Sequence, residues 1–98
     1  MKGREKLKDC KLVYHLTSMP YVLFSQLTEA IEPLEFEADK LIIPSEVKGN
    51  PVEIRVSLFS AEGELIDINS SMVPATKNTV ALAATVAGFK MIEEFIQQ

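Results

Sequence analysis

The sequence predicts a small α+β domain: an antiparallel sheet of three to five strands with two helices packed on it, in the order β-α-β-β-β-α. Three observations indicate this class. Ninety-eight residues leave room for one domain. An apolar fraction of 47% with 24% charged residues is typical of a chain that buries a core. Segments with period-two alternation lie between two stretches of helical periodicity.

Residues 1–10 are expected to form a basic, flexible tail, and residues 11–98 the single domain. The first eleven residues hold five basic and two acidic side chains, a net charge of +3, so the remaining 87 carry −7 of the total of −4. The tail can solvate the terminus, lie on the acidic body, or reach phosphates. The acidic body and the lack of aromatic residues among the basic ones argue against specific nucleic-acid binding.

The first two elements are predicted to be a strand and a helix. Residues 11–17, KLVYHLT, are rich in β-forming side chains. A helix is expected from Ser18 to Glu32, with Ser18 as its N-cap and Pro20 in its first turn. Its apolar residues share a stripe about 120° wide, so this helix packs one face only. They are Leu23, Phe24, Leu27, Ala30 and Ile31.

The middle of the chain predicts further strands. From Leu34 to Asp39 apolar residues alternate with acids, and residues 40–43 add an apolar run before Pro44, as part of the same bent strand or as a second one. A clear alternation begins at Val52, residues 60–63 suit a tight reversal, and the alternation resumes at Ile66. We therefore expect a β-hairpin over residues 52–69.

The last element is predicted to be a helix from Asn78 to Ile96, with Asn78 as its cap. Its apolar residues cover an arc of about 200°, more than one sheet face can cover. Small residues within that arc allow a second helix to approach closely, either the first helix of the chain or a copy of this one. The small size of the chain favours a homodimer. The residues expected at the self-association surface are Ala81, Ala84, Thr85, Gly88, Met91, Ile92 and Phe95.

A resemblance supports this interpretation. Residues 54–95 read IRVSLFSAEGELIDINSSMVPATKNTVALAATVAGFKMIEEF, with a strand, a Glu-Gly turn, a second strand, a loop and an alanine-rich helix. This stretch resembles the central hairpin and second helix of roadblock/LC7 domains. The resemblance implies a non-catalytic homodimer, paired partly through that helix, that acts as a scaffold or regulator for small GTPases or motor complexes. It implies that Ala81, Ala84, Thr85 and Gly88 lie at or near the seam.

Two polar clusters could carry binding. The acids Glu35, Glu37 and Asp39 should share one strand face, which either is simply solvated or binds a basic partner surface. A polar group before the last helix could hold an anion at the helix N-terminus, or could be no more than a capped loop. Its residues are Ser70, Ser71, Thr76, Lys77 and Asn78.

No catalytic, cofactor-binding or metal-binding grouping can be predicted, since Cys10 and His15 are single and an odd separation directs them to opposite faces of a strand. No apolar run reaches the roughly 20 residues of a membrane span, and we expect a cytoplasmic protein. The sequence favours a non-catalytic interaction, regulatory or scaffold module that self-associates through its C-terminal helix and presents an acidic sheet face to a partner. The alternative is a domain or small enzyme that binds an anionic metabolite or nucleotide through residues 69–78.

Overall fold

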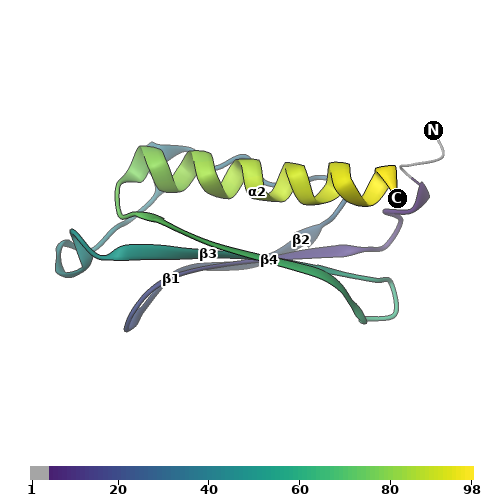
Figure 1. Ribbon diagram of the computed structural model, residues 1–98, viewed down its shortest axis with the longest axis horizontal. Coiled ribbons are helices and arrows are strands. Elements are labelled where there is room, and N and C mark those ends of the chain that lie inside the picture. The colour runs from purple at the N-terminus through teal and green to yellow at the C-terminus, as the bar shows by residue number, and fades with distance from the viewer. Residues whose placement is uncertain (1–4) are drawn as a thin grey trace.

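The computed structural model describes residues 5–98, which form two layers. One layer is a four-stranded antiparallel sheet in the order β2-β1-β3-β4. The other is the long helix α2 together with the irregular segment 30–47, both on the same face of the sheet (Figure 1). The α+β class and the antiparallel sheet are confirmed. The elements are β1 (Lys11–Ser18), β2 (Tyr21–Glu29), η1 (Ala38–Lys40), η2 (Ser45–Val47), β3 (Pro51–Phe59), β4 (Leu65–Pro74) and α2 (Lys77–Gln97).

The predicted helix from Ser18 to Glu32 is wrong, because this segment is a turn followed by β2. Pro20, joined to Met19 by a cis peptide bond, lies in the turn. The Ser18 hydroxyl donates to the carbonyl oxygen of Pro51 at 3.0 Å instead of capping a helix. β2 pairs with β1 over its whole length, and this long-range pairing outweighs the local helical periodicity.

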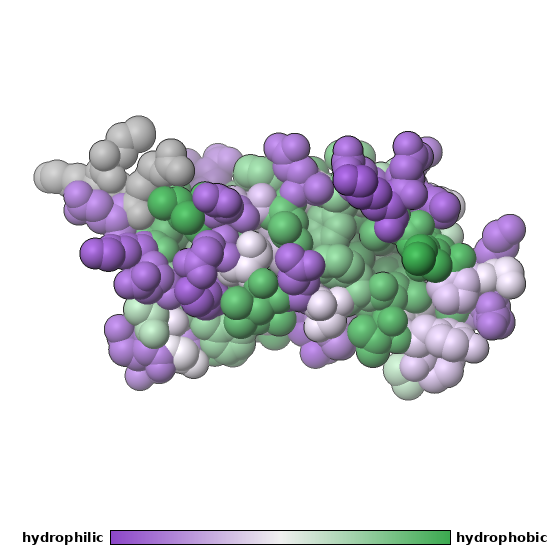
Figure 2. Space-filling view, turned by 180° about the vertical axis from the view of Figure 1, so that it is seen from behind, coloured by the Kyte–Doolittle hydropathy of each residue, from purple (hydrophilic) through white to green (hydrophobic). Residues whose placement is uncertain are grey.

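The strand predicted from Leu34 to Asp39 is also wrong, since these residues pair with no strand. Their alternation is nevertheless real: Leu34 and Phe36 turn toward the core, and Glu35 and Glu37 toward solvent. The Phe36 ring meets that of Tyr14 edge to face, with 5.3 Å between centroids. The segment therefore covers part of the sheet face that also carries α2. Figure 2 shows the molecule from the side of this segment, apolar in the middle and more hydrophilic at both ends.

The strand at residues 11–17, the hairpin and the C-terminal helix are confirmed. The reversal between β3 and β4 contains Gly63 at a φ of +86°, a conformation that favours glycine. The N-cap of α2 is Thr76 rather than Asn78, because the Thr76 hydroxyl oxygen accepts the N–H of Thr79 at 3.3 Å.

The core lies between α2 and the two central strands. The side chains that β1 and β3 direct toward the helix are fully buried, and the apolar ones are Leu12, Tyr14, Leu16, Val52, Ile54, Val56 and Leu58. Leu7 and Cys10, from the segment expected to form a tail, are buried with them. Residues 1–4 of the expected tail lie outside the described residues.

Candidate functional site

The residues predicted at a dimer seam on α2 lie against the chain's own core. Ala84 is 0% exposed and Ala81 5%, and a side chain added at Gly88 would meet the Tyr14 hydroxyl. The Thr85 hydroxyl accepts the N–H of Phe36 at 2.8 Å. Met91 and Ile92 are buried, and Phe95 is partly buried. This surface is therefore closed to a second copy in the structure, and self-association itself stays a prediction.

Ala81, Ala84 and Gly88 form the small-residue stripe of α2, and the close approach of Gly88 to Tyr14 shows that this stripe serves packing within the chain. A Cβ at position 88 would lie 2.1 Å from the Tyr14 oxygen. Glycine thus lets the ring of a central strand fit beneath the helix, and that hydroxyl accepts the N–H of Leu34 at 3.1 Å. Burial raises the pKa of Tyr14.

The residues of the predicted anion site are not brought together. Ser70 and Ser71 are neighbours on β4, so their side chains point to opposite faces of the sheet. The Ser70 hydroxyl donates to the Glu53 carboxylate at 2.7 Å, and Thr76 caps the helix. Lys77 and Asn78 are exposed at its first turn. An anion site built from all five residues would therefore need a different arrangement.

The acids Glu35, Glu37 and Asp39 do not form a sheet face. They are exposed on segment 30–47, beside β2, and Glu37 pairs with Lys40 at 2.7 Å. The Lys40 ammonium lowers the pKa of Glu37. We call the sheet face that is turned away from α2 the outer face. Glu35, Glu37 and Asp39 do not lie on it.

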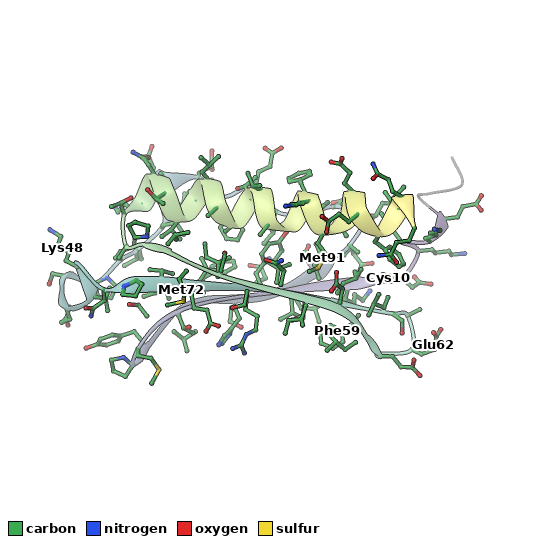
Figure 3. The ribbon with its side chains drawn as sticks, in the orientation of Figure 1. Cys10, Lys48, Phe59, Glu62, Met72 and Met91 are labelled. Carbon is green, nitrogen blue, oxygen red and sulfur yellow. The ribbon has the colours of Figure 1, made fainter. Side chains whose placement is uncertain are left out.

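The outer face can be read from the strand registers, which set four residues side by side across the sheet. One such row is Leu27, Val13, Ser57 and Ile68. The next row toward the β3–β4 turn is Glu29, Lys11, Phe59 and Leu65. Figure 3 shows Phe59 pointing away from the helix, and Met91 lying between helix and sheet. We call the apolar members of these two rows the outer patch: Val13, Leu27, Phe59, Leu65 and Ile68.

The outer patch is exposed. Leu27 is 57% exposed, Leu65 54% and Ile68 49%, while Val13 and Phe59 are partly exposed. A solvated face of an antiparallel sheet ordinarily carries polar residues, so an apolar patch that spans four strands is informative.

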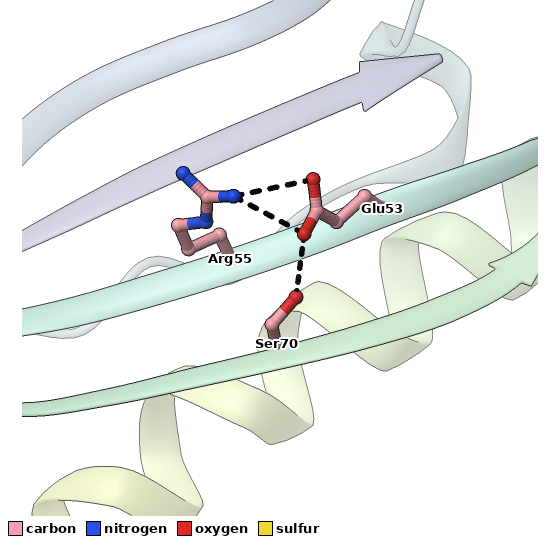
Figure 4. Close-up of polar contacts among 3 residues, drawn as sticks. All are labelled: Glu53, Arg55 and Ser70. Carbon is pink, nitrogen blue, oxygen red and sulfur yellow. Dashed lines mark hydrogen bonds and ion pairs between the residues drawn. The ribbon is translucent and has the colours of Figure 1, made fainter. Parts of the chain in front are cut away.

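Charged side chains on the outer face are paired with one another. Lys11 pairs with Glu29 at the edge of the patch. In a polar row farther along, Arg55 Nη2 lies 3.3 Å from Glu53 Oε2, which also accepts the Ser70 hydroxyl (Figure 4). The Ser70 hydroxyl, and then the Arg55 guanidinium, lower the pKa of Glu53.

A groove of about 240 Å³ lies between β4 and α2. Its floor is polar, with Asp67, Asn69 and Ser71 on the helix side of the strand, and Ala83 and Ala87 lie on its wall. Lys90 and Glu94 also line it. Two carboxylates against one ammonium do not favour an anionic ligand here.

Sequence reasoning missed the outer patch and the groove because it assigned no faces to β4. Pairing with β3 sets Asp67 opposite Leu58 and Asn69 opposite Val56, so both polar residues face the helix side and Ile68 faces outward. The alternation of residues 65–72 would have separated the two sets, but the choice of face depends on the register.

Cys10 and His15 are separated by the sheet. Cys10 is buried and its thiol donates to the carbonyl oxygen of Lys6 at 3.2 Å, while burial raises the pKa of that thiol. His15 lies on the outer face, with its Nδ1 3.4 Å from the Ser25 hydroxyl. Residues 5–98 contain no group of three or more His, Cys, Asp or Glu side chains that could hold a metal ion.

Fold and surfaces together define a two-layer α+β domain with one face of its sheet open. Among the described residues no helix is long and apolar enough to cross a membrane. No family model, curated protein or solved structure matches the chain. The resemblance of residues 54–95 to roadblock/LC7 domains stays a prediction.

Proposed function

We propose that the protein is a small non-catalytic protein-interaction module that self-associates and holds a second protein on the outer face of its sheet. The observation that carries the proposal is the outer patch. It crosses all four strands, and nothing in the described part of the chain covers it. Contiguous exposed apolar surface of this kind is characteristic of interaction sites.

The partner that this face fits is an uncharged, apolar protein surface. Lys11 and Arg55 already pair with carboxylates on the same face. A charged partner would have to compete with these pairs, whereas an apolar one can bury the patch and leave them at the rim. Cores of protein interfaces are depleted in charge in the same way.

A matched pair of variants on β2 tests this function. Leu27 and Ser25 both project from the outer face, but only Leu27 belongs to the outer patch. Proteins that co-purify with the wild type would be purified and titrated calorimetrically against the wild type and each variant. We expect Leu27→Glu to weaken binding at least tenfold, Ser25→Glu to leave it nearly unchanged, and binding to show a negative heat-capacity change. Equal binding by both variants would refute a partner on this face.

Self-association is tested separately, by sedimentation velocity over a range of micromolar concentrations. The proposal predicts a dimer that dissociates on dilution. A monomer at every concentration would remove self-association and leave the partner site to stand on its own test.

A further inference from the structure

We propose that two copies pair along β4, antiparallel and about a two-fold axis near Asn69, so that the two sheets become one and the two α2 helices lie side by side above it. This inference rests on the self-association in the proposed function and assigns it a surface. The surface differs from the small-residue stripe of α2, which the chain's own core occupies.

The edge of β4 is open. β4 is ten residues long, ends the sheet, and is exposed along nearly its whole length, as the strand nearest the viewer in Figure 1. Its only charged residue is Asp67, whose carboxylate accepts the N–H of Ile68 at 2.8 Å. A long strand with unpaired backbone groups and few charges is a template for another strand.

Helix spacing agrees with this pairing. α2 contacts both β3 and β4, and the proposed dimer sets its axis above the line between these two strands. In a continuous sheet the two helix axes would then be separated by two strand spacings, about 9.6 Å. Packed helices lie about 8–10 Å apart. Strand pairing would thus bring the helices to contact distance without any rearrangement.

The flanks of the helices that would meet carry the small residues Ala83 and Ala87, together with Val86, Lys90 and Glu94. Ala83 and Ala87 face the groove above β4 and are only partly buried. Side chains that end at Cβ permit the close approach that a separation of about 9.6 Å requires. The exposed residue Leu82 lies on another side of the helix and does not line the groove.

The contact would be of adequate size. β4 and α2 are each about 30 Å long, from ten and 21 residues at the usual rises. The molecule is 21 Å and 19 Å across its shorter axes. A strip of about 30 Å by about 20 Å gives a projected area of about 600 Å² for each copy, close to the roughly 800 Å² of a stable interface.

Side chains across the two-fold axis would be complementary. Residues that face each other must lie on the same side of the sheet, and an axis at Asn69 places Asp67 opposite Ser71 of the second copy. The serine hydroxyl can donate to the carboxylate, and symmetry supplies this pair twice. No like charges face each other on the strand.

The other edge is unsuited to a second copy. β2 is followed at once by segment 30–47, and this side of the molecule carries five carboxylates, of which Glu29 pairs with Lys11 and Glu37 with Lys40. Pairing at β2 would bring two such segments together, and repulsion between like charges disfavours that arrangement. The carboxylates on this side are Glu29, Glu32, Glu35, Glu37 and Asp39.

Cross-linking tests the seam in full-length chains that carry Cys10→Ser. Residues opposite each other at a two-fold axis of antiparallel strands have Cα atoms about 4.5–5.5 Å apart, within the range of a disulfide. Asn69→Cys should therefore give a disulfide-linked dimer under mild oxidation, and Gln26→Cys on β2 should not. Dimer from Gln26→Cys alone would overturn the proposal.

A second measurement needs no cross-link. Ala87→Glu would place two carboxylates near the axis, so it should raise the dissociation constant in sedimentation at least tenfold. Leu82→Glu, on another side of the same helix, should leave that constant within about twofold. A wild-type dimer that responds to Leu82→Glu and not to Ala87→Glu would refute the β4 seam while self-association survives. A wild-type monomer would refute both.

Discussion

β3 and β4 are neighbours, pair along their length and contact the same helix. They differ in which side chains face that helix: mainly apolar ones on β3 and mainly polar ones on β4. β3 turns Val52, Ile54, Val56 and Leu58 toward α2, and all four are fully buried. β4 turns Asp67, Asn69 and Ser71 toward the helix, with Val73 beyond them at the edge of the core, and it turns Ile68 and Met72 outward. Leu65, Ile68 and Met72 are each about half exposed or more.

The difference shows which parts of the molecule the chain stabilises by itself. Burying one Leu, Ile or Val side chain contributes about 1.5–3 kcal/mol, so β3 supplies much of the folding free energy. Apart from Val73, β4 gains little from its own apolar residues and is held by hydrogen bonds to β3 and by one flank of the helix. Two features of β4 remain exposed: its outward apolar side chains and the backbone groups along its free edge. These are the surfaces that we assign to binding.

The largest expected effect separates the two strands directly. Ile54→Ala on β3 should reduce the free energy of unfolding by about 2–5 kcal/mol, because it leaves a cavity in the core. Ser71→Ala, opposite Ile54 on β4, should change it by less than about 0.5 kcal/mol. Urea denaturation of both variants measures the difference, and comparable losses would show that β4 is part of the core after all.

A smaller loss is expected at the contact between helix and sheet. Gly88→Ala would place its Cβ 2.1 Å from the Tyr14 oxygen, and the overpacking should cost about 1–3 kcal/mol. Tyr14→Phe removes that oxygen, so in denaturant melts the double variant should lose less than the sum of the two single losses. Additive losses would argue against the contact. Substitution at Gly88 therefore tests folding and not self-association.

Tyr14 also predicts a pH dependence. Burial raises the pKa of its phenol, so the folded chain keeps a proton that the unfolded chain loses near pH 10. The free energy of unfolding should be insensitive to this group below about pH 10 and fall as the pH rises through that value. In chains carrying Cys10→Ser, Tyr14→Phe should reduce the fall and Tyr21→Phe, at an exposed position, should not. An unchanged fall in the Tyr14 variant would contradict the assignment.

The smallest effect concerns the outward side of β4. The Ser70 hydroxyl, and then Arg55, lower the pKa of Glu53. Ser70→Ala should therefore raise that pKa toward its ordinary value, and Arg55→Gln should raise it as well. Titration of the Glu53 carboxyl carbon by NMR measures both shifts. A pKa unchanged in the Ser70 variant would show that the hydrogen bond is absent in solution.

Much of the fold could be predicted because the signals for the hairpin and α2 are local. The alternation from Val52, the turn before Gly63 and the length of the last apolar run each specify one structure. The segment from Ser18 to Glu32 carried two compatible patterns, and pairing with β1 decided between them. Leu34 to Asp39 shows a further limit: alternation reports an extended chain with one buried side, and does not require a neighbouring strand.

The candidate surfaces could be predicted less well. The 200° arc of α2 correctly indicated a helix that contacts more than the sheet. The further cover comes from segment 30–47, through Phe36 and Thr85, and not from a second helix of the chain. The outer patch depends on the register between β3 and β4, which sets Ile68 opposite Ser57 and, after an irregularity between Leu58 and Phe59, sets Leu65 opposite Phe59. No sequence pattern specified that register.

Hydrogen exchange at two protein concentrations tests the β4 seam most directly. Raising the concentration from below to above the dissociation constant should slow exchange of amides along β4, while amides of β2 keep their rates. Slower exchange at β2 with no change at β4 would contradict the account, and so would rates independent of concentration at both edges.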